Sequence, residues 1–453
     1  MTGIFRAYDI RGVYGQDLTV EQGVRVGKAF GTFLEGASEV VVGRDSRISG
    51  PVLSNALVSG LLSTGCNCVD VGLVPTPIIY FASVHYGKRA GVMLTASHNP
   101  PEYNGFKLCR EGLSFSYDTA IGQVEKLVES GRFKEATWEE VGSYRSQEVS
   151  QDYMEFILGK IHVERKLKVV IDVGNGTCGF AGGLFKKLGC DVEVLFPEPD
   201  GRFPHHIPNP LKEETLVELQ RRVVESKADF GIAFDGDGDR VGFIDDRGQV
   251  VRSDAPFMLF ARDVLRRHPN SKIIIDVLSS KAVSEDIAAH GGVPLMMRVG
   301  HSYIQEGLFR EGASFAGELS GHFYFGRDYY GYDDGVFAAV KMVEILSKTE
   351  RSLSKVIEVL PRYVSSPEIR LKCADDRKVG VVEALKRKFQ GEGYRIIDID
   401  GVRVEFEDGW GLVRVSNTEP ALVLRFEASS KDRVDYIQRL ILGETEKALS
   451  SMS

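Results

Sequence analysis

The sequence predicts an α/β protein of three doubly wound domains, with mixed or parallel sheets, followed by a smaller α+β domain at the C-terminus. Short apolar runs alternate with stretches of helical spacing over about the first 360 residues. This alternation is typical of sheets with helices on both faces. The pattern restarts with the apolar runs at residues 167–173 and 272–277, and it changes near residues 365–367, where meandering strands begin.

The first predicted domain, residues 1–150, begins with alternating strands and helices. Residues 40–43 form an apolar strand, residues 51–62 have helical spacing with a proline near the start, and residues 67–71 form the next strand. Proline is favoured in the first helical turn because its missing N–H is not needed there. A further apolar run at residues 91–94 predicts a buried strand.

The other predicted domains span residues 151–253, 254–365 and 366–453. In the second domain, residues 230–234 and 241–244 form strands on either side of a short acidic segment. The last domain is expected to begin with a strand, followed by a helix, three further strands and a final amphipathic helix, at residues 377–389, 401–406, 410–416, 421–427 and 431–449. Several domains also follow from the length, because 453 residues are too many for one core.

The composition is that of an ordinary globular protein, with 43% hydrophobic and 26% charged residues. A formal net charge of −8 disfavours nonspecific binding to nucleic acid. No apolar run approaches the length needed to span a membrane, and the N-terminus lacks the apolar segment of a secretory signal. The six cysteines have no metal-binding spacing and are expected to be small buried residues in a reducing compartment. A cytoplasmic location is therefore expected.

The most informative short segment is residues 95–100, Thr-Ala-Ser-His-Asn-Pro, directly after the predicted buried strand. It places the Ser97 hydroxyl beside the His98 imidazole at the rim of a sheet, where reactive groups are commonly held. A serine in this position can attack phosphorus or carry a phosphoryl group. The same residue types are ordinary turn formers, so the segment alone leaves a plain turn open.

A second segment, residues 235–240, has the sequence Asp-Gly-Asp-Gly-Asp-Arg. Asp235, Asp237 and Asp239 alternate with glycines, which permit the positive φ angles of a loop wrapped around a cation. All-oxygen ligation suits hard cations, and Mg²⁺ is expected beside a phosphate. An EF-hand is excluded because Arg240 stands where that loop requires glycine, and because strands flank the segment. A solvated acidic turn is the remaining alternative.

These two segments resemble the α-D-phosphohexomutase superfamily, whose members move a phosphate between the 1- and 6-positions of a hexose. Three further segments match the family in the same order: Phe-Arg-Ala-Tyr-Asp-Ile-Arg-Gly at residues 5–12, Gly-Glu-Leu-Ser-Gly-His at 317–322, and Arg-Val-Ser-Asn-Thr-Glu-Pro at 414–420. Leu319 is typical of the phosphomannomutase/phosphoglucomutase branch, since the glucosamine branch usually has Gln there.

The resemblance implies an isomerase that interconverts the 1- and 6-phosphates of mannose, glucose or both. The implied path runs through a phosphorylated Ser97 and a hexose 1,6-bisphosphate, which also serves as activator. The implied Mg²⁺ ligands are Ser97, Asp235, Asp237 and Asp239. Phosphoserine and three aspartates carry more negative charge than one divalent cation neutralises, so Lys107 and Arg240 are the candidates for the remainder. His98, Lys107 and His301 remain open as the group that accepts the proton of the sugar hydroxyl.

The reaction also requires a distal site that accepts a phosphate in either orientation of the intermediate. An arginine fork with hydroxyl, amide and backbone N–H donors suits this purpose, and a hairpin turn is the alternative. The candidate distal residues are Arg414, Ser416, Asn417 and Thr418. The candidates for contacts to the sugar or its phosphate are Tyr8, Arg11, His301, Glu318, Ser320 and His322.

Two positions leave their roles open. The branch often has a basic residue contacting the substrate where Leu278 stands, and Lys281 and Arg298 are the nearby alternatives. His301 either contacts the substrate or is a satisfied turn histidine.

Residues 174–179, Gly-Asn-Gly-Thr-Cys-Gly, match the G-x-G-x-x-G pattern and suggest a nicotinamide-dependent oxidoreductase as a different class. The next strand, residues 191–196, does not end in an acidic residue placed for a ribose, so a tight strand-to-helix turn is favoured. A metal-dependent phosphatase and a non-catalytic sugar-phosphate sensor are further alternatives. The expected partner is a small sugar phosphate, and the oligomeric state is not predicted.

Overall fold

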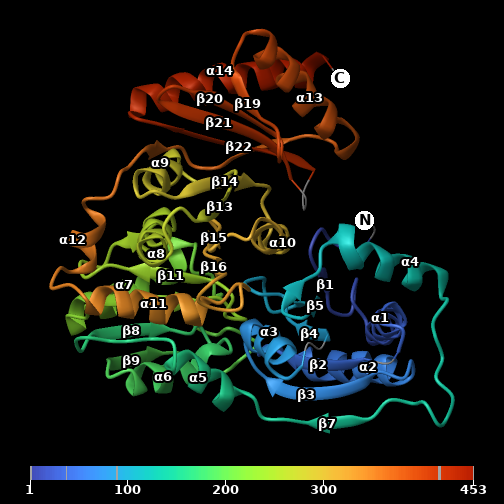
Figure 1. Cartoon of the computed structure of the whole chain (residues 1–453). Helices are drawn as coiled ribbons and strands as arrows, with labels where there is room; N and C mark the ends of the chain where they lie inside the picture. Colours follow the sequence, from blue (N-terminus) through green and yellow to red (C-terminus); the bar gives the residue numbers. More distant parts are fainter. Residues whose placement is uncertain (1–2, 37, 88–89, 417–419, 452–453) are drawn as a thin grey trace.

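The protein, seen in a computed structural model that describes residues 3–36, 38–87, 90–416 and 420–451, has the predicted fold class. Four sheets follow one another along the chain, each with its own helices (Figure 1). The predicted boundaries near residues 150, 253 and 365 stay predictions. Residues 364–365 already pair with the fourth sheet.

The first sheet contains seven strands in the order β1-β5-β4-β2-β3-β7, with β6 paired to β5. Its strands are β1 (Ile10–Val13), β2 (Glu39–Arg44), β3 (Asn67–Leu73), β4 (Ala90–Leu94), β5 (Tyr103–Arg110), β6 (Leu113–Ser114) and β7 (Tyr144–Ser146). Its helical segments are α1 (Val20–Phe33), α2 (Gly50–Leu62), α3 (Thr76–His85), the π-helical turn η1 (Tyr117–Ile121) and α4 (Gly122–Ser130). Val40 and Val42 pack with α1 and α2, whereas Val41 packs with α3, so helices cover both faces.

The second and third sheets are smaller, with the strand orders β12-β11-β10-β8-β9 and β14-β13-β15-β16. The second unit contains α5 (Ser150–Leu158), β8 (Lys168–Asp172), η2 (Cys178–Phe180), α6 (Ala181–Lys187), β9 (Asp191–Leu195), α7 (Glu213–Ser226), β10 (Phe230–Phe234), β11 (Val241–Ile244) and β12 (Val250–Val251). The third contains α8 (Asp254–Arg267), β13 (Lys272–Asp276), α9 (Lys281–Ala289), β14 (Val293–Met297), α10 (His301–Glu311), β15 (Phe315–Gly317), β16 (Phe323–Phe325), α11 (Gly335–Ser347) and α12 (Leu353–Ile357).

The fourth sheet is antiparallel throughout and is drawn above the third in Figure 1. It runs in the order β17-β22-β21-β20-β19, with β18 paired to β22. The unit contains β17 (Val364–Ser365), β18 (Ile369–Lys372), α13 (Asp375–Gly391), β19 (Arg395–Ile397), β20 (Val402–Phe406), β21 (Gly409–Val415), β22 (Ala421–Ala428) and α14 (Lys431–Ser451). The predicted helices and strands of the α+β domain are all present, whereas β17 and β19 were not predicted.

Each of the first three sheets combines parallel strands with an antiparallel hairpin. β4 is parallel to β2, β10 to β8, and β15 to β13. The strand that follows each of them, β5, β11 or β16, runs antiparallel to it. A connection of only a few residues can join antiparallel neighbours, whereas parallel strands need a long crossover. Three comparable hairpin loops result, at residues 95–102, 235–240 and 318–322.

A continuous apolar core joins the first three units, whereas the fourth unit has its own core. Between the third and fourth sheets lies a small cluster of Val277, Trp410 and Leu412. The buried Arg403 on β20 stacks on Trp410 and donates hydrogen bonds to the carbonyl oxygens of Val277 (2.6 Å) and Ser279 (3.1 Å). This polar and aromatic contact is one of those that attach the fourth unit to the third.

All six cysteines lie in described segments; they are buried and free, as expected. Within the described ranges, no helix has both the length and the apolar character needed to cross a membrane.

Candidate active site

The site forms where the hairpin loops of the first three sheets meet. Ser97 Oγ, in the loop after β4, donates a 2.6 Å hydrogen bond to Asp235 Oδ2, in the loop after β10, although 138 residues separate them. A Cβ at Gly236 would lie 2.7 Å from the Ser97 carbonyl oxygen. Gly236 is therefore required by this close approach, whereas Gly238 supplies the positive φ (+71°) expected of the loop.

Two residues that the sequence analysis missed hold the serine loop. The buried Arg47 donates hydrogen bonds to four backbone carbonyl oxygens, those of Ser97 (2.9 Å), Asn99 (2.7 Å), Pro100 (2.6 Å) and Tyr103 (2.8 Å). Asp45 accepts from Arg47 Nε (3.1 Å) and from Thr95 Oγ1 (2.7 Å). The available signal was the charged run at residues 44–47, directly after a buried strand.

Asp235, Asp237 and Asp239 are completely buried, and ligand atoms from all three lie within 4.8 Å of one another. Lys107 Nζ donates to Asp237 Oδ2 at 2.7 Å and also to Asp239 Oδ2. Burial opposes charge on Lys107, but Asp237 and Asp239 more than offset this and raise the pKa of its amine. Thr76, also missed, donates its hydroxyl proton to Asp237 Oδ2 at 2.6 Å.

The three carboxylates differ in their electrostatics. Burial, followed by Asp237 and Asp239, raises the pKa of Asp235 well above its ordinary value. Burial also acts to raise the pKa of the other two carboxyls. Lys107, together with Thr76 at Asp237 and with His322 and Arg240 at Asp239, outweighs burial and lowers both pKa values. Two buried oxygens, Asp237 Oδ1 and Asp239 Oδ1, have no hydrogen-bond partner among the described residues. Unpaired carboxylate oxygens in a buried all-oxygen set fit a hard divalent cation.

His98, Arg11 and Arg240 lie around the serine. His98 Nδ1 is 2.9 Å from Ser97 Oγ, and burial, with Arg240 and Arg11, lowers the pKa of the imidazole well below its usual value. Arg11 donates to Asn99 Oδ1 at 2.7 Å. The Arg240 backbone N–H donates to Asp235 Oδ1 at 3.2 Å, while its buried Nε has no hydrogen-bond partner within the described ranges. Two guanidinium groups therefore accompany a neutral imidazole at Ser97.

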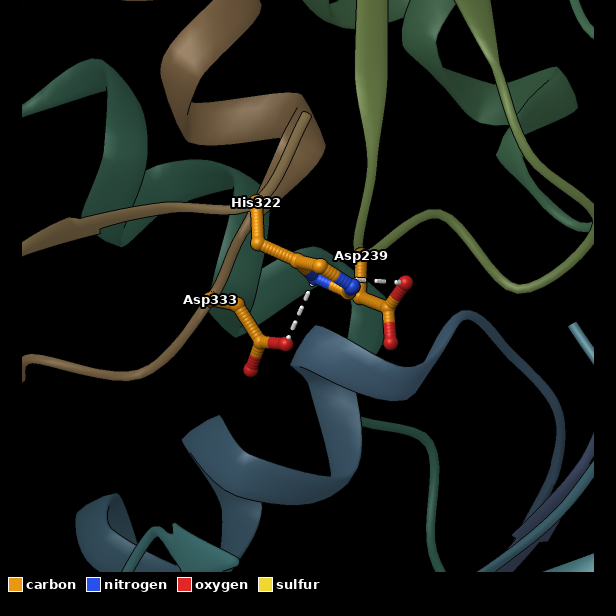
Figure 2. A group of neighbouring side chains, drawn as sticks. All are labelled: Asp239, His322 and Asp333. Atoms are coloured by element: carbon orange, nitrogen blue, oxygen red, sulfur yellow. Dashed lines mark ion pairs between the residues drawn. The ribbon is translucent and has the colours of Figure 1, made fainter. Parts of the chain in front are cut away.

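The third loop brings His322 to the acidic cluster, and Figure 2 shows its ring between two carboxylates. His322 Nδ1 lies 2.9 Å from Asp333 Oδ2 and 3.8 Å from Asp239 Oδ1. Burial lowers the pKa of His322 to about 4. Asp333 was not predicted, because its position before α11 gives no sign that it contacts another loop.

His301 is the first residue of α10 and is 6% exposed. Neither ring nitrogen has a hydrogen-bond partner in the described part of the chain, and burial lowers its pKa to about 4. Its ring lies edge-on to that of Tyr8, with 5.1 Å between centroids, and 5.9 Å from the ring of His322. The ring nitrogens are thus available to a ligand, with Asp333 Oδ2 3.9 Å from Nδ1.

Glu318 begins the third loop and is held on both sides. Its Oε1 accepts from the Gly300 N–H (2.9 Å), and its Oε2 accepts from the Tyr324 hydroxyl (3.1 Å). Burial raises the pKa of this carboxyl. Ser320, in the same loop, is half-buried.

The fourth unit contributes Arg414, on β21, and the buried Ser416. Arg414 Nη2 donates to Asp400 Oδ2 at 2.8 Å, and the same oxygen accepts from the backbone N–H of Val299 at 3.2 Å. The arginine is thereby connected to the chain just before His301. Asn417 and Thr418 lie outside the described residues.

Lys281 and Arg298, the two basic residues considered because Leu278 stands where the family often has one, differ in their contacts. Lys281 Nζ donates to the carbonyl oxygens of Phe406 (3.4 Å) and Glu407 in the fourth unit, so it joins two units. Arg298 lies over the Tyr303 ring, 3.3 Å from its centroid, and pairs with Asp118 at 2.8 Å. Of the two, only Arg298 lies beside the loop that carries His301.

The glycine-rich segment at residues 174–179 supports the acidic loop. The backbone N–H and the hydroxyl of Thr177 both donate to the Gly236 carbonyl oxygen, at 3.2 and 3.1 Å. A Cβ at Gly176 would lie 2.8 Å from that oxygen. The glycines thus permit close packing in a strand-to-helix turn, which is the favoured alternative to a dinucleotide site.

Comparison with known proteins agrees with this arrangement. The phosphoglucomutase/phosphomannomutase family matches through its alpha/beta/alpha domains I, II and III, at residues 2–135, 151–248 and 252–363, and through its C-terminal domain at residues 368–443. The phosphomannomutase/phosphoglucomutase of Pseudomonas putida is 44% identical over 96% of this chain and 94% of its own. The phosphoglucomutase of Neisseria gonorrhoeae is 42% identical over 96% of this chain and 95% of its own.

A solved structure agrees as well. The crystal structure of a phosphoglucomutase/phosphomannomutase family protein from Burkholderia thailandensis has a TM-score of 0.92 and 40% identity, covering 98% of this chain and 97% of that one. Fold, site and sequence together define an enzyme of the phosphohexomutase class. The chain belongs to the phosphoglucomutase/phosphomannomutase family.

Proposed function

We propose that this enzyme interconverts the 1- and 6-phosphates of glucose and mannose through a phosphorylated Ser97 and a hexose 1,6-bisphosphate. The observation that carries the proposal is the 2.6 Å contact between Ser97 Oγ and Asp235 within a buried acidic cluster. The names of the relatives, which include both phosphomannomutase and phosphoglucomutase, support the two sugars.

The proposed metal is Mg²⁺, held by Asp235, Asp237, Asp239 and the Ser97 oxygen. When bound, it supplies positive charge beside the transferring phosphoryl group. The two unpaired carboxylate oxygens at Asp237 and Asp239 support this assignment.

In the forward half-reaction, the bond between phosphorus and Ser97 Oγ breaks, and a bond from phosphorus to a sugar oxygen forms. Lys107 and Arg240 stabilise negative charge on the phosphoryl group, as expected for a transfer that depends on positioning and electrostatics. The hydroxyl proton of the sugar passes to His98 or His301, since, despite burial, Asp237 and Asp239 raise the pKa of Lys107 and keep its amine protonated. The neutral imidazole of His98, 2.9 Å from Ser97 Oγ, supports a role for this side chain next to the reacting oxygen.

The remaining predicted residues bind the substrate in this proposal. Arg414 and Ser416, with Asn417 and Thr418, hold the distal phosphate, and the buried Arg414 Nε, unpartnered among the described residues, supports this. The sugar and its phosphate contact Tyr8, Arg11, His301, Glu318, Ser320 and His322. After half a cycle the bisphosphate turns around and returns its other phosphate to Ser97.

The direct test is an assay of glucose 1-phosphate and mannose 1-phosphate with Mg²⁺ and a trace of the matching 1,6-bisphosphate. We expect formation of both 6-phosphates by the unmodified enzyme. Ser97→Ala should lower turnover at least about 10³-fold, because the nucleophile is lost, while the protein stays folded. Sustained release of inorganic phosphate without a 6-phosphosugar would instead indicate a phosphatase, and normal turnover by Ser97→Ala would exclude this serine.

The partner of this enzyme is thus a small sugar phosphate. A cytoplasmic location is part of the same proposal, since hexose phosphates are intracellular metabolites.

A further inference from the structure

Asp400, which has no role in the proposed function so far, lies between two parts of the site. Its Oδ2 accepts from Arg414 Nη2 at 2.8 Å, within the fourth unit, and from the Val299 backbone N–H at 3.2 Å, in the third unit. Both carboxylate and guanidinium are largely buried, at 17% and 12% side-chain exposure. A charge-assisted bond in such a place is stronger than a solvent-exposed one.

The turn that carries Asp400 is fitted closely to the arginine. The next residue, Gly401, has φ +85°, and a Cβ there would lie 2.4 Å from the Val413 carbonyl oxygen and 2.7 Å from both Cα and Cβ of Arg414. No other residue type fits this position without moving the strand. The carboxylate is therefore delivered to Arg414 by backbone geometry as well as by charge.

The other partner of Asp400 lies in a short segment in which successive residues contact different parts of the site. The Val299 N–H donates to Asp400, and the Gly300 N–H donates to Glu318 Oε1 at 2.9 Å. His301 packs against the ring of Tyr8 in the first unit. A movement of the fourth unit that breaks the Asp400 contact would release one of these three attachments.

The negative charge of Asp400 by itself opposes the binding of an anion by Arg414, but the geometry of the pair offsets this effect. It bonds only Nη2, and the buried Nε has no hydrogen-bond partner among the described residues. The carboxylate thus fixes the plane of the guanidinium while leaving another donor for a phosphate. A guanidinium already held in one orientation loses less side-chain entropy when it binds a phosphate.

We propose that Asp400 is a positioning residue that orients Arg414 for the distal phosphate and couples it to the segment that holds Glu318 and His301. Binding of the distal phosphate and docking of the fourth unit on the third then favour each other. This inference rests on the proposed function, in which Arg414 binds that phosphate.

The test compares Asp400→Ala and Asp400→Asn with Asp398→Ala. Asp398 is a matched control from the same turn, because it is 52% exposed and pairs only with Lys386 among the described contacts. For Asp400→Ala we expect a 10- to 100-fold lower kcat/KM for glucose 1-phosphate, roughly the loss of one charge-assisted hydrogen bond, with most of the change in KM. Asp400→Asn keeps one acceptor oxygen, so its kcat/KM should lie between those of Asp400→Ala and the unmodified enzyme. Asp398→Ala should match the unmodified enzyme.

A double-mutant cycle with Arg414→Ala separates positioning from general structural damage. If Asp400 acts through Arg414, adding Asp400→Ala to Arg414→Ala should lower kcat/KM by much less than it does alone. Fully additive losses would overturn the proposal, as would equal kinetics for Asp400→Ala and Asp398→Ala.

A binding measurement keeps the test independent of turnover. Calorimetric titration of glucose 1,6-bisphosphate should give at least about tenfold weaker binding to Ser97→Ala/Asp400→Ala than to Ser97→Ala. Equal affinities would refute the role of Asp400 even if the mutase reaction is confirmed. If the unmodified enzyme shows no turnover but Asp400→Ala still weakens binding of the bisphosphate, the mutase reaction would be refuted and the role of Asp400 would stand.

Discussion

At the scale of single residues, Ser97 has an unusual backbone that its neighbours maintain. Its φ is +50°, in the left-handed region that non-glycine residues seldom occupy. Thr95 Oγ1 accepts from the Ser97 N–H at 2.8 Å, and Arg47 binds the Ser97 carbonyl oxygen at 2.9 Å. Such a conformation persists where surrounding bonds overdetermine it. The backbone that carries the hydroxyl is therefore held both by a residue of the same segment, Thr95, and by the distant Arg47.

Replacement of Arg47 should test this directly. Arg47→Lys places a compact ammonium where a fork bonds four carbonyl oxygens, so we expect about 2–4 kcal/mol of lost stability from buried acceptors left without donors. Mutase turnover should also fall, because the Ser97 loop loses its support. Thermal and urea unfolding measure the first effect, with the exposed Arg132→Lys as control. Unchanged stability and turnover would contradict this account of the loop.

The sequence analysis found Ser97 and the three aspartates because each lies within a short, recognisable segment. It missed Arg47, Thr76 and Asp333 for a physical reason. Their partners are backbone carbonyls, a carboxylate and an imidazole of other loops, so no local spacing reveals the contact. For Arg47 the nearest of these partners is 50 residues further along the chain.

At the scale of elements, the three hairpin loops explain why distant motifs converge. Each loop joins a central strand to an antiparallel neighbour, so each lies at the carboxyl edge of its sheet. The alternation of strands and helices predicted the strands themselves. It did not show that β5, β11 and β16 reverse direction, because periodicity carries no information on strand polarity.

The contact between the first two loops gives a prediction for Gly236→Ala. The added methyl would lie 2.7 Å from the Ser97 carbonyl oxygen and would push the loops apart. We expect turnover to fall about 10²-fold, since misplacement by about 1 Å has effects of this size. Gly183→Ala, in α6 with open space around its Cβ, is the matched control and should keep full activity. Equal activities for the two variants would show that the loops need not approach so closely.

The N-terminus of α11 gives a prediction on pH. Asp334 caps the helix, accepts from the Phe337 N–H at 2.8 Å and from two tyrosine hydroxyls, and burial raises its pKa to about 7. Its folded pKa exceeds the unfolded value, so the folded state binds more protons between about pH 4 and 7. The contribution of this carboxyl to stability therefore falls as the pH rises through that range.

Asp334→Asn removes the titrating group and keeps an acceptor for the helix cap. Relative to this variant, the unmodified protein should lose roughly 2–4 kcal/mol of stability between pH 4 and pH 7. Urea unfolding at several pH values measures the difference. Parallel pH profiles for the two proteins would show that Asp334 does not titrate in this range.

At the scale of the whole molecule, the chain consists of a joined block and an attached unit. The first three units share one apolar core, and the fourth is attached through polar and aromatic contacts that include those of Arg403, Lys281 and Asp400. The acidic loop of the second unit meets the serine of the first, so a cation bound there would connect two units. Metal binding is therefore expected to affect stability as well as activity.

Removal of metal tests this connection. After treatment with a chelator, we expect turnover to be lost and to return with Mg²⁺. Saturating Mg²⁺ at about 100 times its dissociation constant should stabilise the folded protein by about 2.7 kcal/mol. In Asp237→Asn, most of this stabilisation by Mg²⁺ should be lost, which a thermal unfolding experiment with and without Mg²⁺ measures. Full activity after complete chelation, verified by metal analysis, would remove the metal from the proposal.

The sequence by itself determined the fold class, the order of the elements and the segments that carry reactive groups, because periodicity and short motifs are local properties. Only the tertiary structure decided which groups meet. It brought Ser97 to Asp235, Arg47 to the serine loop and Asp400 between two units. These contacts depend on strand direction and on the packing of separate sheets, and neither is encoded in neighbouring residues.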